Sequence, residues 1–199
     1  MAKTHNERYY QTEQEDSRGL LNAVTQALQT YTEGLGTIRV SDLLMEYNGN
    51  VNALARAFAG LPDTGKLPAK GTDDRRAYDT ANRSINRYLN YEAGTGKQAR
   101  NPGKPATQAR LRSLMAKKKP PTSAGVTITG SIGYDRGDFR HRTVGNPPIS
   151  LSGDAITRFL ESMSAGDTHS AYREVFTSYG ASMLMVGDSE PPDIAITFE

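Results

Sequence analysis

The sequence predicts an α+β protein, in which an N-terminal helical domain containing a helix-turn-helix precedes a C-terminal domain in the order β-β-α-α-β-β. Two observations carry this prediction. In residues 18–119 the apolar positions recur every three or four residues, as in amphipathic helices, whereas from Gly125 they alternate with polar positions, as in a half-buried strand. Pro120 and Pro121 lie where the period changes, so we place the domain boundary between residues 119 and 122.

The composition excludes several classes of protein. A chain of 199 residues accommodates one large or two small domains, and the absence of cysteine rules out disulfides and thiolate zinc sites. The first residues contain no apolar signal region, and no stretch of about 18 consecutive apolar residues occurs anywhere. We therefore expect a cytoplasmic protein that makes no contact with a membrane.

The first helices are predicted from apolar spacing. Residues 1–17 are polar and are expected to form a flexible N-terminus. An amphipathic helix follows and ends at Gly34, and its apolar residues are Leu20, Leu21, Val24, Ala27, Leu28 and Tyr31. A second, short helix is expected around Leu43, Leu44 and Tyr47. These helices precede the helix-turn-helix and are expected to support it.

The helix-turn-helix consists of two further amphipathic helices. The first carries Val51, Leu54, Ala55 and Phe58, and the second, over residues 79–91, carries Ala81, Ile85, Tyr88 and Leu89. Residues 60–78 lie between them, whereas an ordinary helix-turn-helix has a turn of roughly 3–4 residues. A plain pair of packed helices has the same apolar spacing, so both interpretations stay open at this point.

The outward face of the second helix favours DNA recognition. It is made almost entirely of arginine and asparagine, namely Asn82, Arg83, Asn86, Arg87 and Asn90. Arginine pairs bidentately with guanine, asparagine pairs with adenine, and both bind phosphate. An ordinary solvated helix face includes glutamate, which this face lacks. We therefore predict that this face reads bases in the major groove.

A basic segment follows the predicted reading helix. From Arg75 to Lys119 the chain has twelve basic residues and two acidic ones, which phosphate binding explains. The backbone contacts are predicted to come from Lys97, Arg100, Lys104, Lys117, Lys118 and Lys119. Cations in the last turn of a helix also interact favourably with the helix dipole, so stabilisation of the helix is the alternative role of the final three lysines. Residues 150–199 are acidic by contrast, so the C-terminal domain is not expected to bind the polyanion.

The C-terminal domain is predicted from a change of period. Val126, Ile128 and Ile132 alternate with threonine and serine, and a partner strand runs from Phe139 to Val144 and ends at the Asn-Pro-Pro of residues 146–148. Two helices follow, around Phe159 and around Phe176, and then two strands, at residues 182–186 and 194–198. Short strands with exposed edges invite pairing, so we expect self-association or partner binding through this domain.

The chain shows no constellation for catalysis or metal binding. Gly60 to Lys66 approaches a phosphate-binding loop, but Leu67 stands where a serine or threonine is required to bind magnesium. The histidines His5, His141 and His169 share no ligand spacing. We therefore expect neither an enzyme nor a cofactor nor a metal site.

Several segments, taken in order, resemble the telomere terminal proteins of linear actinomycete replicons. The similar segments are the Asn-Val-Asn-Ala-Leu-Ala-Arg-Ala-Phe-Ala-Gly of residues 50–60, the Arg-Ser-Ile-Asn-Arg-Tyr-Leu of 83–89, the Ala-Gly-Val-Thr-Ile-Thr of 124–129 with Ile-Gly-Tyr at 132–134, and the Tyr-Arg-Glu-Val-Phe of 172–176. They extend, with gaps, from Asn50 to the end. The insertion at residues 60–78 and the lysines near the domain boundary depart from the family pattern.

The resemblance implies a function in end replication. Members of that family bind DNA, and one hydroxyl becomes joined to the 5′ end of the DNA and primes the polymerase. In this chain the implied attachment residues are Thr129, which we prefer, and Thr127, both on the polar face of the first strand. Threonine is also simply a good strand residue, which is the structural alternative.

The sequence thus predicts a sequence-preferring DNA-binding protein of replicon maintenance, associated with the nucleoid. Residues 18–119 form its helical DNA-binding domain with a basic arm, and residues 122–199 form an α+β association domain. Its expected partners are double-stranded or telomeric DNA, a second copy of the chain, a polymerase and a telomere-associated protein. The alternative is a plasmid- or phage-type transcriptional repressor or replication-initiation protein without covalent DNA linkage.

Overall fold

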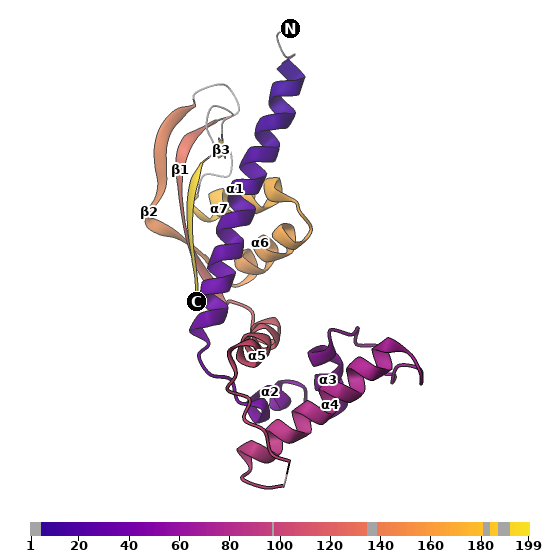
Figure 1. Cartoon of the computed structure of the whole chain (residues 1–199). Helices are drawn as coiled ribbons and strands as arrows, with labels where there is room; N and C mark the ends of the chain where they lie inside the picture. Colours follow the sequence, from indigo (N-terminus) through magenta and orange to yellow (C-terminus); the bar gives the residue numbers. More distant parts are fainter. Residues whose placement is uncertain (1–4, 97, 135–138, 181–183, 187–191) are drawn as a thin grey trace. The chain divides into compact units, whose positions relative to one another are not determined.

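The computed structural model describes residues 5–96, 98–134, 139–180, 184–186 and 192–199 (Figure 1). In these residues it contains seven helices and four strands, which confirms the α+β class. The helices are α1 (His5–Gly34), α2 (Val40–Glu46), α3 (Val51–Ala59), α4 (Asp73–Glu92), α5 (Pro105–Lys118), α6 (Asp154–Ser164) and α7 (Thr168–Ser178). The strands are β1 (Ser123–Tyr134), β2 (Arg140–Ser152), β3 (Leu184–Val186) and β4 (Asp193–Phe198).

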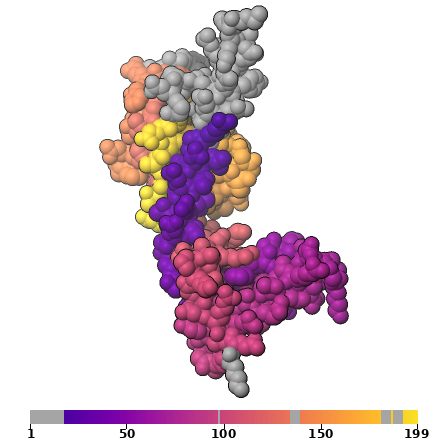
Figure 2. All heavy atoms as spheres, viewed as in Figure 1, coloured from indigo at the N-terminus to yellow at the C-terminus, as the bar shows by residue number. Residues whose placement is uncertain are grey.

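The chain divides into two units that are not consecutive in sequence. Unit 1 consists of Met1–Tyr31 and Pro121–Glu199, and unit 2 is Thr32–Pro120. Unit 2 is therefore inserted between α1 and β1. In unit 1 the indigo atoms of the first segment lie beside the yellow atoms of the last one (Figure 2).

This division differs from the one expected from sequence. The sequence predicts that residues 18–31 belong to the helical DNA-binding domain, but α1 packs with the sheet of unit 1. The reason is that an apolar stripe shows which face of a helix is buried and not which partner buries it. The sequence also predicts a flexible N-terminus over residues 1–17, whereas the backbone is helical from His5.

The sheet of unit 1 is antiparallel, with β1 as its central strand. β2 pairs with one edge of β1, and β4 and then β3 pair along the other edge. In this register Val126 lies between Ile149 and Ile196, so apolar side chains line up across one face. Threonine and serine occupy the alternate positions of β1 and lie on the opposite face.

Helices from both ends of the chain cover the apolar face of the sheet. Leu20 of α1, Phe159 of α6 and Phe176 of α7 join one core with Val126 and Ile128, and all five are at most 1% exposed. Burying each such side chain contributes about 1.5–3 kcal/mol. The apolar face and its three helices therefore account for the cohesion of unit 1.

A bulge interrupts β2, and the strand continues beyond it. Val126 lies opposite Ile149 but Ile128 lies opposite Val144, so four residues of β2 face Thr127. A side chain at Gly145 would overlap the carbonyl oxygen of Val126, and its φ of 91° also requires glycine. The prolines at 147 and 148 therefore lie inside a bulged strand that runs to residue 152, and the expectation that they end it is wrong.

Unit 2 is a small helical domain with its own core. The buried residues come from α2, α3, α4 and α5 and from the segment before α2: Ile38, Val40, Leu43, Leu54, Ala55, Phe58, Tyr78, Ala81, Ile85, Tyr88, Leu111, Leu114 and Met115. Helix α4, which contains the predicted reading helix, begins at Asp73, six residues earlier than predicted. The side chain of Thr72 caps it, with Asp73 and Asp74 in the first turn. The insertion between α3 and α4 is correspondingly shorter, Gly60–Thr72.

A search of the described residues finds no helix with the length and apolar character needed to span a membrane.

The packing of α1 against the sheet gives a stability prediction. Replacing the fully buried Leu20 by alanine should lower the free energy of unfolding by about 2–5 kcal/mol, because a cavity forms under the sheet. The neighbouring Leu21 is 50% exposed, so Leu21→Ala is a matched control with an expected change below about 0.5 kcal/mol. Urea unfolding and amide hydrogen exchange of β1 and β4 would measure both. Equal, small effects would contradict the assignment of α1 to unit 1.

Candidate nucleic-acid interface

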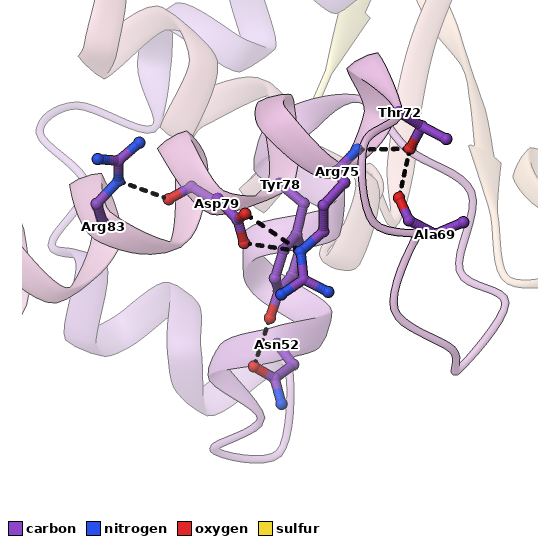
Figure 3. Close-up of polar contacts among 7 residues, drawn as sticks. All are labelled: Asn52, Ala69, Thr72, Arg75, Tyr78, Asp79 and Arg83. Atoms are coloured by element: carbon purple, nitrogen blue, oxygen red, sulfur yellow. Dashed lines mark hydrogen bonds and ion pairs between the residues drawn. The ribbon is translucent and has the colours of Figure 1, made fainter.

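Helix α4 is fixed in unit 2 by its apolar side and by its first turns. Tyr78, Ala81, Ile85 and Tyr88 are buried at helical spacing. The Tyr78 hydroxyl also donates to Oδ1 of Asn52 on α3, at 2.7 Å, as Figure 3 shows. These contacts determine which side of α4 faces outward.

The five residues of the predicted reading face all lie on the outward side of α4. Arg83 and Asn86 are exposed, and Asn82, Arg87 and Asn90 are half-buried. None of them belongs to the core of unit 2. We call this set the α4 face.

The first turns of α4 carry balanced charges. The guanidinium of Arg75 bonds to the carboxylate of Asp79 at 3.0 Å, and that of Arg76 bonds to Asp73 at 3.0 Å (Figure 3 shows the first pair). Asp74 is also exposed here. This half of the helix therefore has little net attraction for a polyanion.

The second half of α4 keeps its positive charge. Arg83 donates from Nε to the main-chain oxygen of Asp79 at 3.2 Å, and Arg87 donates from Nη2 to the amide oxygen of Gln98 at 3.1 Å. Both acceptors are neutral, and neither arginine has an ion pair among the described residues. The two charges therefore remain available to an anionic ligand.

The next carboxylate along the chain, Glu92, is occupied elsewhere. Its two oxygens accept the main-chain N–H groups of Val40 and Ser41, at 2.6 and 2.9 Å, at the start of α2. Arg39, the residue before α2, makes no side-chain cap of its own. Glu92 thus serves as the cap of α2, a role that the basic context of the sequence does not reveal.

The loop after α4 folds back on the α4 face. The N–H of Arg100 donates to the carbonyl of Arg87 at 3.0 Å, and the N–H of Thr95 donates to that of Asn90 at 2.9 Å. The guanidinium of Arg100 lies 6.0 Å from the centre of the Tyr88 ring. Arg100, predicted to contact the DNA backbone, therefore lies beside Arg87 of the α4 face. Lys97 lies outside the described residues.

The remaining predicted lysines lie on α5 or at its ends. Lys104 precedes the first residue of α5 and is exposed, as is Lys117 in the last turn. Lys118 lies 4.4 Å from the centre of the Tyr47 ring, and Lys119 forms an ion pair with Glu46 at 2.9 Å. The structure thus brings the last two lysines to the end of α2.

An ionic contact holds the start of the insertion against α3. Arg56 is 5% exposed and bonds to Asp63 at 3.0 Å. Burial raises the pKa of the Tyr47 phenol, and the negative charge of Asp63 raises it further. The Asp63 carboxylate therefore forms an ion pair with Arg56 of α3 and influences the pKa of Tyr47 at the end of α2.

Gln108 of α5 joins two segments inside unit 2. It is 6% exposed, accepts the N–H of Ile38 at 2.9 Å, and donates to the carbonyls of Ile38 and Pro102 at 3.1 and 3.3 Å. It thereby ties the segment before α2 to the end of the loop that carries Arg100. Neither Gln98 nor Gln108 stands out in the sequence, since a glutamine has no charge or apolar period to signal a partner.

The two threonines implied as attachment residues lie on the polar face of β1. The hydroxyl of Thr127 donates to the carbonyl of Gly145 at 2.9 Å, inside the bulge. The hydroxyl of Thr129 shares a hydrogen bond of 3.0 Å with that of Thr143 on β2. Both threonines are half-buried.

A search of the described parts of the chain finds no cluster of three or more histidine and carboxylate side chains able to hold a metal ion.

Comparison of the chain with protein-family models, with curated proteins and with solved structures finds no match. The resemblance to telomere terminal proteins stays a prediction.

The Glu92 cap gives a second stability prediction. Glu92→Ala should lower the free energy of unfolding of unit 2 by about 1–3 kcal/mol, because two N–H groups lose a charged acceptor. Glu161→Ala on the exposed side of α6 is the control, with an expected change below about 0.5 kcal/mol. Urea unfolding measures both, and a Glu92 variant as stable as the control would show that the cap contributes nothing.

Proposed function

We propose that this chain is a DNA-binding protein that contacts duplex DNA through the α4 face and the loop folded back on it. One observation carries the proposal: Arg83 and Arg87 on the α4 face, and Arg100 in the loop that bonds to Arg87, have no carboxylate ion-pair partner among the described residues. Uncompensated guanidinium groups on a rigid helix favour an anionic ligand.

The distribution of charge along α4 supports a specific approach of the DNA. The first turns hold exposed aspartates and ion-paired arginines, whereas the second half holds asparagines and two arginines that form no ion pair among the described residues. A polyanion is therefore attracted to the C-terminal half of α4 and to the following loop. Asparagine and arginine on one exposed helix face suit the edges of bases in the major groove.

The role of this DNA binding is proposed from the resemblance stated above. We infer a sequence-preferring protein of replicon maintenance in which unit 1 associates with a second copy or with replication proteins. Thr129 is the better attachment residue, because the hydroxyl of Thr127 holds the bulge through the Gly145 carbonyl. A repressor or replication-initiation protein would use the same α4 face and carry no covalent nucleotide.

A covalent nucleotide would distinguish these two functions. Protein purified from cells that carry its replicon and digested with nuclease should retain a nucleotide mass on the peptide that contains Thr129, and Thr129→Val should remove it. Thr143→Val is the matched control. It loses the same shared hydrogen bond but keeps the Thr129 hydroxyl, so the nucleotide mass should remain. An unmodified peptide in the natural protein would establish the non-covalent class.

Phosphate contact by the folded-back loop predicts a change in salt dependence. The logarithm of the binding constant falls with the logarithm of salt concentration by about 0.9 per phosphate contacted, so Arg100→Gln should reduce that slope by about 0.9. The exposed Arg173 of α7 lies in unit 1, and Arg173→Gln should leave the slope unchanged. Mobility-shift titrations over a salt series measure both slopes. Equal slopes for the two variants would show that Arg100 does not contact a phosphate of the DNA.

A further inference from the structure

The hydrogen bonds on the α4 face show a difference between its arginines and its central residue, Asn86, in the donors that remain available to a ligand. Nδ2 of Asn86 donates to both the main-chain oxygen and Oδ1 of Asn82, at 2.9 and 3.0 Å. A side-chain amide has two N–H donors, so both are engaged. Bidentate recognition of adenine requires one of them for N7 of the base. Asn86 is therefore committed to bracing Asn82 and lacks a donor for adenine.

The two arginines keep the donors that guanine requires. A guanidinium carries five N–H donors. Arg83 engages Nε and Arg87 engages one hydrogen of Nη2, and neither makes another side-chain hydrogen bond within the described part of the chain. Each therefore retains a pair of parallel N–H groups for O6 and N7 of guanine.

The spacing of the two arginines limits the separation of the bases they reach. They lie one helical turn apart on the same side of α4, which is about 6 Å along the helix axis. Successive base pairs of DNA are stacked about 3.4 Å apart. A helix lying along the major groove therefore brings the two guanidinium groups to bases one or two steps apart.

Gln98, the neutral hydrogen-bond partner of Arg87, suits the recognition of a guanine by Arg87. Gln98 accepts a hydrogen bond from the guanidinium of Arg87, and the N–H of Arg100 donates to the main-chain carbonyl of Arg87. Both the backbone of Arg87 and the tip of its side chain are therefore restrained. A carboxylate at position 98 would restrain Arg87 equally but would cancel its charge. An amide orients the fork and leaves the charge for the DNA.

We propose that Arg83 and Arg87 read two guanines one or two base-pair steps apart in duplex DNA, and that Gln98 is a positioning residue for Arg87. This inference rests on the proposed function. Asn86 does not read a base. Phosphate, which an arginine fork also fits, is the competing ligand, and it differs from guanine in being present at every step of any sequence.

The first experiment tests base reading with the full-length chain. Selection from random duplexes should enrich a site with two G·C pairs at this spacing. Replacing either guanine by 7-deazaguanine, which lacks N7, should weaken binding about 5- to 150-fold. Unchanged binding to both substituted duplexes, or no enriched guanine pair, would overturn the guanine assignment.

Matched variants test the residues. Arg83→Lys and Arg87→Lys keep the charge but lose the fork, so each should weaken binding to the selected duplex about 5- to 150-fold and leave binding to a scrambled duplex and the salt slope unchanged. Arg173→Lys makes the same exchange on the exposed surface of unit 1, outside the α4 face, and is the control, with an expected change of less than about twofold. A loss for Arg83→Lys and Arg87→Lys no larger than that of Arg173→Lys would overturn the assignment.

Two substitutions of Gln98 separate orientation from charge. Gln98→Ala should reduce the preference for the selected duplex over the scrambled one and leave the salt slope unchanged. Gln98→Glu should retain the acceptor but pair with Arg87 and cancel its charge, so binding to the selected duplex should weaken more than it does for Gln98→Ala. A preference unchanged by Gln98→Ala would overturn the positioning role. Circular dichroism would confirm that these surface variants are folded.

Failure of this inference is distinguishable from failure of the proposed function. A chain that binds selected and scrambled duplexes equally, with strong salt dependence, is a DNA-binding protein that does not read guanines through α4. A chain without salt-dependent binding to any duplex overturns both proposals.

Discussion

The burial of one side of α4 is the constraint on which the candidate interface depends. Tyr78, Ala81, Ile85 and Tyr88 enter the core of unit 2, and the hydroxyl of Tyr78 adds a hydrogen bond to α3. Because a helix is rigid, the burial of these four positions determines the direction of all the others. The arginines and asparagines of the α4 face are outward for that reason, and not because a surface feature holds them there.

Features that depend on nearby residues were predictable from the sequence. The alternation around Val126 and Ile128 predicts β1, and the spacing of Ile85 and Tyr88 predicts both α4 and its outward face. The start of α4 is not predicted because residues 73–76 are all charged and offer no apolar period. The signal was nevertheless present, since Thr72 followed by two aspartates is a favourable helix start.

Features that depend on distant residues were not predictable. In the sequence Glu92 is one of two acids in a basic segment, whereas in the structure it caps a helix some fifty positions earlier in the chain. The hydrogen bond of Gln98 to Arg87 and the burial of Gln108 have no local signature. The apolar stripe of α1 was recognised, but its partner, the sheet, lies on the other side of unit 2 in the sequence.

The insertion of unit 2 between α1 and β1 has a consequence for how the chain is made. Domains fold as they leave the ribosome, beginning with the N-terminal one. Here α1 emerges before unit 2, but the sheet that buries Leu20 and Val24 is synthesised only after the whole of unit 2. The helical unit therefore completes its core while α1 still exposes its apolar stripe. Newly made chains pass through a stage in which that stripe is a target for chaperones or for association with other nascent chains.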